Sequence, residues 1–123
     1  MLDIQASVRF IFPNAPIRPV TINGGMEMRA WYDIDPGAPL AGGEDIKNSV
    51  AAIRSIVAEE IAAGIPSERI ALAGFSQGGV IALELGLSHN QPLAGIMALS
   101  TYLHDHEQIT ERIGLANVET PIF

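Results

Sequence analysis

The pentapeptide Gly74-Phe75-Ser76-Gln77-Gly78 contains the residue types that place a nucleophilic serine at a sharp turn. It stands between an apolar run, Ile70 to Ala73, and a helical pattern that begins near Gln77. At such a strand-to-helix turn the serine adopts strained backbone angles, so the residues two positions away on each side must be very small, as Gly74 and Gly78 are. We expect the Ser76 hydroxyl to stand above a sheet and the Gln77 N–H to point toward a developing acyl oxyanion.

A serine with an ordinary pKa also needs a base within hydrogen-bond reach, and the histidines are the candidates. His89 ends the helix that follows the serine, about 18 Å away at 1.5 Å per residue, where it suits the helix dipole rather than catalysis. The run His104-Asp105-His106 follows the next apolar strand and could open on the same sheet edge. Adjacent polar residues at a helix start more often form a solvated cap, and no third ligand is evident. We therefore predict no metal and no cofactor.

Composition restricts the class of protein. The 123 residues are 48% hydrophobic, enough for one domain spanning 1–123 with a packed core. The net charge of −7 opposes binding to nucleic acid or to anionic lipid. The absence of cysteine excludes thiolate catalysis and fits a reducing compartment. With no basic-then-apolar leader pattern and no apolar run of about 18 residues, we expect a cytoplasmic protein without a membrane span.

Strand and helix patterns alternate around the serine. Predicted strands cover Ser7 to Pro13, Ile70 to Ala73 and Leu93 to Leu99, and the second predicted helix runs from Gln77 to about Ser88. The first predicted helix runs from Glu44 to the stop signal at Gly64, with an apolar stripe at spacings of three and four: Ile46, Val50, Ile53, Val57 and Ile61. This alternation predicts an α/β fold with parallel strands joined by right-handed crossovers.

Two further stretches are less regular. Asn14 to Gly43 is rich in proline and glycine and predicts a long loop, with an extended stretch over Met26 to Ile34. A loop of this length inside a compact domain is usually functional, so we expect it to roof a pocket. His104 to Ala116 predicts a short helix, and Thr120 to Phe123 predicts the opening of one more strand.

Four blocks follow one another along the chain: Phe10 to Pro16, Met28 to Ile34, Ala73 to Gly79 and Ala98 to Leu103. In this order they resemble the carboxylesterase and acyl-protein thioesterase family of α/β-hydrolases. The resemblance implies a three-layer fold, Ser76 as the nucleophile and the Gln77 N–H as one oxyanion donor. It also places Trp31 beside the acyl pocket, although an aromatic residue that merely anchors the loop explains Trp31 and Tyr32 equally well.

The resemblance also implies parts that this sequence lacks. Relatives carry an upstream strand whose loop gives a second oxyanion donor, and they place the catalytic aspartate and histidine after the strand that Pro121 opens. We therefore expect a sheet truncated at both ends, without a strand between Val8 to Phe12 and Ile70 to Ala73. Because unpaired buried backbone groups cost about 1 to 3 kcal/mol each, we expect these two strands to pair directly, or another chain to fill the space.

Two functions remain open on this basis. The first is hydrolysis of short to medium acyl esters or thioesters through an acyl-enzyme on Ser76. The second is a catalytically impaired module that associates with itself, as a homo-oligomer, or with a complementary fragment through exposed strand edges. A base supplied by His104 or His106 of a neighbouring subunit is a weaker third alternative.

Overall fold

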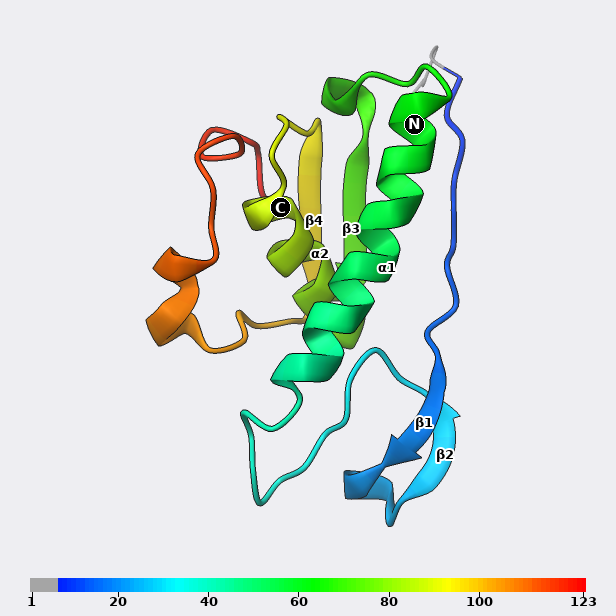
Figure 1. Cartoon of the computed structure of the whole chain (residues 1–123), viewed down its shortest axis with the longest axis vertical. Coiled ribbons are helices and arrows are strands. Elements are labelled where there is room, and N and C mark those ends of the chain that lie inside the picture. Colours follow the sequence, from blue (N-terminus) through cyan, green and yellow to red (C-terminus); the bar gives the residue numbers. More distant parts are fainter. Residues whose placement is uncertain (1–6) are drawn as a thin grey trace.

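Residues 7–123 are described by a computed structural model (Figure 1). In chain order its elements are β1 (Ile17–Val20), a 3-10 turn (Thr21–Asn23), β2 (Met26–Arg29), α1 (Gly43–Ala62), a 3-10 turn (Ser67–Arg69), β3 (Ala71–Phe75), α2 (Gln77–Ser88), β4 (Gly95–Leu99) and a 3-10 helix (His106–Glu111). Helices and strands alternate from α1 to β4, so the predicted α/β class is confirmed.

The centre of the fold is the β3-α2-β4 unit, in which β3 and β4 pair in parallel. Leu72 lies opposite Ile96 in this register, and both side chains are buried beneath α2. From α2 itself, Val80 and Leu85 are completely buried in the same core. Burying each such side chain contributes about 1.5 to 3 kcal/mol, so this unit supplies the main apolar contribution near Ser76.

Helix α1 packs against α2 and completes the layer of helices on one face of the sheet (Figure 1). Its predicted stripe is observed: three of the five residues are buried and the other two are partly buried against the core, namely Ile46, Val50 and Val57, then Ile53 and Ile61. The helix ends before Gly64, whose φ of 106° is a left-handed value that suits glycine. The predicted stop signal is confirmed.

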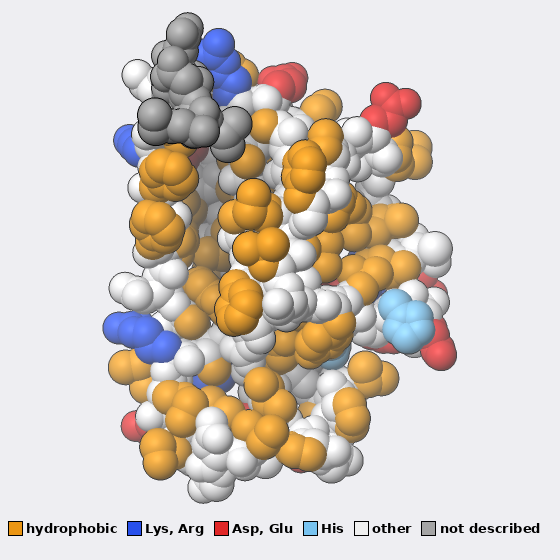
Figure 2. All heavy atoms as spheres, turned by 180° about the vertical axis from the view of Figure 1, so that it is seen from behind, with side chains coloured by type: hydrophobic (Ala, Val, Ile, Leu, Met, Phe, Trp, Pro, Cys, Tyr) orange, Lys and Arg blue, Asp and Glu red, His pale blue; other side chains and the backbone are white. Residues whose placement is uncertain are grey.

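The opposite face of β3 and β4 is open within residues 7–123. Residues that alternate with the buried pair point to this side, and the large ones are exposed: Phe75, Met97 and Leu99. Figure 2 shows hydrophobic side chains spread over the molecule seen from this side. The described residues therefore supply two layers, one of helices and one of strands, of the three-layer arrangement that the resemblance implies.

The predicted strand from Ser7 to Pro13 is not part of any sheet. Residues 7–16 form an extended segment beside α1 (Figure 1), where Arg9 forms an ion pair with Glu60. Within residues 7–123, β3 has β4 as its sole partner strand, so the prediction that the two strands pair directly is wrong. Residues 7–14 are exposed throughout.

The long loop contains more structure than its composition predicts. β1 and β2 form an antiparallel hairpin whose turn uses left-handed glycines, Gly24 and Gly25. Near the C-terminus the predicted helix from His104 to Ala116 is reduced to the 3-10 helix His106–Glu111. The predicted strand opening is observed, because Ile122 bridges Ile96 in parallel on the outer edge of β4.

His89 is the buried histidine at the end of α2. It is 5% exposed, and neither ring nitrogen has a hydrogen-bond partner among residues 7–123. Burial, and then the nearby charge of Arg54, lower the pKa of His89 below its ordinary value near 6.5. The folded protein therefore resists protonation of this ring.

We expect the free energy of unfolding to fall as the pH drops below about 6.5. Below pH 6.5 His89 of the unfolded state binds a proton, whereas His89 of the folded state stays neutral until the pH reaches its lower pKa. Above about pH 6.5 His89 is neutral in both states and makes no contribution to the pH dependence of stability. Urea unfolding at pH 5.0 and 7.5 measures the difference, and His89→Leu should reduce it. His106→Gln, which changes an exposed histidine, is the matched control. An unchanged pH dependence in His89→Leu would contradict the assignment.

Candidate active site

Ser76 lies at the turn between β3 and α2. Its backbone angles are φ 52° and ψ −116°, a positive φ that is rare for residues other than glycine. Such a conformation costs about 1 to 3 kcal/mol and persists only where surrounding contacts enforce it. The sequence pattern predicts a strained turn at this serine, and the structure has a strained turn at Ser76.

Hydrogen bonds from the neighbouring strand hold Ser76 in this conformation. Its N–H donates to the carbonyl oxygen of Leu99 at 2.9 Å, which extends the β3–β4 pairing by one residue. Its own carbonyl oxygen accepts from Thr101 Oγ1 at 2.7 Å and from the Gly79 N–H at 3.0 Å. The loop after β4 therefore positions the turn, a role of Thr101 that the sequence pattern did not indicate.

The glycines around Ser76 are not equivalent. A Cβ on Gly74 would lie 2.0 Å from the carbonyl oxygen of Gly78, and a Cβ on Gly79 would lie 2.5 Å from Cβ of Thr101. A Cβ on Gly78 would meet only Nε1 of Trp31, at an ordinary 3.8 Å. The close approach of β3 to α2 thus requires glycine at 74, and the approach of Thr101 to α2 requires it at 79, whereas at 78 an alanine fits.

The Ser76 residue is exposed, as a nucleophile that meets a substrate must be. The Gln77 N–H is the first of α2, and within residues 7–123 it donates to no protein acceptor. A free N–H at a helix start, next to the serine, can stabilise negative charge on an acyl oxygen. This arrangement fits the predicted roles of both residues.

The side chain of Gln77 joins α2 to the loop that carries Trp31. Its Oε1 accepts from the Trp31 N–H at 3.0 Å, and its Nε2 donates to the Tyr32 carbonyl oxygen at 2.8 Å. Ser49 of α1 donates its hydroxyl to the Trp31 carbonyl oxygen. Side chains from both helices therefore satisfy the peptide groups around Trp31, which stands beside Gly78 and so next to the turn.

Tyr32 and Asp33, the next residues of the same loop, also form hydrogen bonds that hold it in place. The Tyr32 and Tyr102 hydroxyls lie 3.0 Å apart, and burial, with a smaller effect of Tyr102, raises the pKa of Tyr32 well above its ordinary value. Asp33 accepts hydrogen bonds from the N–H and hydroxyl of Thr21, which lower the pKa of its carboxyl group. Asp33 thus connects the loop to the 3-10 turn Thr21–Asn23.

No histidine forms a hydrogen bond with the serine within the described part of the chain, because the Ser76 hydroxyl forms none there. His89 lies at the opposite end of α2. His104 is buried, with Nε2 close to Gly43 at the start of α1, and His106 is exposed at the start of the 3-10 helix. The structure therefore brings together Ser76, Gln77 and Trp31, and within residues 7–123 none of the three histidines forms a hydrogen bond with them.

Residues 7–123 contain neither a metal-binding cluster nor a membrane-spanning helix. No group of three or more histidine, aspartate or glutamate side chains there is arranged to hold a metal ion. No helix in the same range is long and apolar enough to span a membrane. The cytoplasmic location stays a prediction.

Residues 4–123 match the phospholipase/carboxylesterase family. The chain belongs to this family. It is 40% identical over 119 residues to acyl-protein thioesterase 1 of Yarrowia lipolytica, covering 94% of this chain and 52% of that protein. It is 45% identical over 125 residues to the protein of the same name from Neurospora crassa, covering 94% of this chain and 51% of that one.

Solved structures of esterases and thioesterases superpose on this chain. The crystal structure of Arabidopsis thaliana SOBER1 superposes with a TM-score of 0.82 at 32% identity, over 91% of this chain and 55% of that one. Zea mays acyl-protein thioesterase 2 gives a TM-score of 0.65 at 25% identity, over 82% of this chain and 48% of that one. The α/β-hydrolase-like fold is thus shown, and the chain spans about half the length of the relatives it matches.

We expect Gly74→Ala to destabilise the fold by about 3 kcal/mol or more, because its Cβ would collide with backbone that cannot move without displacing Ser76. Gly78→Ala is the matched control, and it should cost less than about 1 kcal/mol because its Cβ meets only ordinary contact. Urea unfolding monitored by circular dichroism measures both. Equal losses in the two variants would show that the close approach at Gly74 is not what holds the turn.

Proposed function

We propose that Ser76 is the nucleophile of a serine esterase or thioesterase that acts on short to medium acyl esters or thioesters. Oγ of Ser76 forms a bond to the acyl carbon, and the bond from that carbon to the leaving oxygen or sulfur breaks. The hydroxyl proton leaves with the alcohol or thiol, and water then releases the acid from the acyl-enzyme. The Gln77 N–H stabilises the oxyanion in both steps.

The observation that carries this proposal is the backbone of Ser76, with its positive φ between β3 and α2 and its hydroxyl free of protein partners within residues 7–123. Strained residues of this kind cluster at active sites. The relatives named acyl-protein thioesterase support the acyl substrate class. Trp31, held beside Gly78 by Gln77, supplies an apolar wall for the acyl group.

No residue among 7–123 acts as the base in this scheme, because the Ser76 hydroxyl has no hydrogen-bond partner there. A serine without a base loses most of its reactivity, since removal of triad members lowers kcat by several orders of magnitude. The base is therefore a group outside the described contacts, either further sequence of the kind found in the longer relatives or a residue of another subunit.

A fluorophosphonate probe tests the reactivity of Ser76. We expect a covalent adduct on Ser76 by mass spectrometry, no adduct in Ser76→Ala, and an unchanged adduct in Ser100→Ala, which alters another positive-φ serine. A full-length thioesterase relative serves as the positive control. If the relative reacts and this chain does not, the chain as given is not an active serine hydrolase.

A second candidate function is association through the free edge of β3. Ser76 donates to Leu99, so in this register Ala71, Ala73 and Phe75 direct their N–H and C=O groups to the other edge. No strand among residues 7–123 pairs there, and the sheet face beside it is apolar and exposed. An open edge of this kind accepts a strand from another chain.

Analytical ultracentrifugation tests this second candidate. We expect a concentration-dependent dimer or larger species, and we expect Ala73→Pro to shift the equilibrium toward monomer because proline removes the N–H at the middle of the edge. Ala63→Ser, on the exposed end of α1, is a control that should change nothing. A well-folded, strictly monomeric wild-type chain would exclude self-association.

A further inference from the structure

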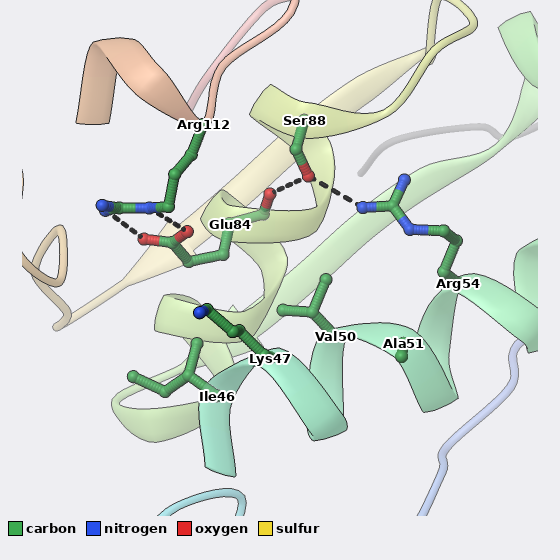
Figure 3. A pocket seen from close by; sticks show the side chains of 8 residues that line it. All are labelled: Ile46, Lys47, Val50, Ala51, Arg54, Glu84, Ser88 and Arg112. Carbon is green, nitrogen blue, oxygen red and sulfur yellow. Dashed lines mark hydrogen bonds and ion pairs between the residues drawn. The ribbon is translucent and has the colours of Figure 1, made fainter. Parts of the chain in front are cut away.

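A groove of about 270 Å³ lies between α1, α2 and the segment after the 3-10 helix (Figure 3). We call it the α1/α2 groove, and its lining residues are Ile46, Lys47, Val50, Ala51, Arg54, Glu84, Ser88 and Arg112. Its size is at the lower limit for small-molecule sites, so it fits a small ligand. Its residues from α2 belong to the half of the helix that leads away from Ser76.

The charge of the groove is opposite to that of the whole chain. Three of the seven lysines and arginines line it, in a chain of net charge −7. Glu84 supplies its single lining carboxylate, and Arg112 neutralises it with two hydrogen bonds at 3.1 and 3.2 Å. Arg112 also donates to the carbonyl oxygens of His104 and Asp105, so its Nε and Nη2 donors are engaged within the protein.

Arg54 has no such compensation. It donates to Ser88 Oγ at 2.9 Å, and no carboxylate among residues 7–123 forms an ion pair with it. Arg54 is a partly buried residue, and its guanidinium lies at one end of the groove (Figure 3). Within residues 7–123 its other N–H donors form no hydrogen bond, and their planar arrangement matches a carboxylate or phosphate group. An uncompensated cation in a partly apolar recess attracts an anion more strongly than one in open water.

Lys47 stands seven residues before Arg54 on the same face of α1, about 10 Å away along the helix axis. Its ion pair with Glu44 spans 4.0 Å between two exposed side chains, so water screens it and the ammonium can turn to another anion. The apolar side chains of Val50 and Ala51 line the wall between the two cations. The groove thus combines positive charge at its ends with an apolar surface between them.

We propose that the α1/α2 groove binds an amphiphilic anion, with a carboxylate or phosphate head group on Arg54 and a short aliphatic chain along Val50 and Ala51 toward Lys47. The bidentate donors of Arg54 orient the head group. The apolar wall favours an alkyl chain over a bare inorganic ion. This site does not depend on the reactivity proposed for Ser76.

Amide chemical-shift titration of the whole chain tests the proposal, with octanoate and octyl phosphate as probes. Both the charge and the chain are required, so octanol, acetate and inorganic phosphate should each bind at least about tenfold more weakly. Shifts should concentrate on residues 46–54 and 84–88. Preference for octanoate or for octyl phosphate identifies which head group the site selects.

Matched charge variants complete the test. Arg54→Gln should weaken octanoate binding about tenfold or more, Lys47→Gln less, and Arg69→Gln, which removes an exposed cation elsewhere, not at all. Ser76→Ala should bind as the wild type does. Arg54→Lys, which keeps the charge but not the planar fork, should be intermediate and serves if Arg54→Gln does not fold. Equal binding by Arg54→Gln and Arg69→Gln, octanol binding as tight as octanoate, or no binding at all would overturn the proposal.

Discussion

The close approach of two backbone segments at Gly74 is the constraint on which the site depends. There is no room for a Cβ between Gly74 and the carbonyl oxygen of Gly78, so β3 and α2 can meet at this angle only with glycine at position 74. The sharp change of direction forces a positive φ on Ser76. Bonds to Leu99 and Thr101 then hold the strained residue in place, because they fix both its N–H and its carbonyl oxygen.

Side chains replace strand pairing where the loop approaches this turn. Gln77 and Ser49 satisfy the N–H and carbonyl groups of Trp31 and the carbonyl group of Tyr32, which a neighbouring strand would otherwise bond. Gln77 therefore has two roles. Its backbone N–H has no acceptor within residues 7–123 and lies beside Ser76, while its side chain holds Trp31 near the same serine. A single residue therefore both holds Trp31 and carries the N–H that would stabilise an oxyanion at Ser76.

The sheet, in contrast to this loop, has backbone groups without partners within residues 7–123. β3 has a free edge and one exposed face within residues 7–123, and Phe75, Met97 and Leu99 lie uncovered there. The core between α1, α2 and the inner face is nevertheless well filled, with Val80, Leu85 and Ile96 completely buried. The unit that positions Ser76 is therefore complete on the helical side, which is the side that forms the turn.

The sequence by itself determined the α/β alternation, the limits of α2 and the strained turn at Ser76, because these depend on local periodicity and on glycines a few residues apart. It did not reveal the hairpin of β1 and β2, because the proline and glycine of this stretch predict a loop. It also missed the roles of Thr101 and the Gln77 side chain, whose partners lie tens of residues away along the chain. It also predicted pairing for residues 7–13, whose β-forming composition is genuine. Only the tertiary structure decided that this segment stays apart from β3, since a strand forms where a partner's backbone lies within hydrogen-bond reach, and no local pattern encodes that distance.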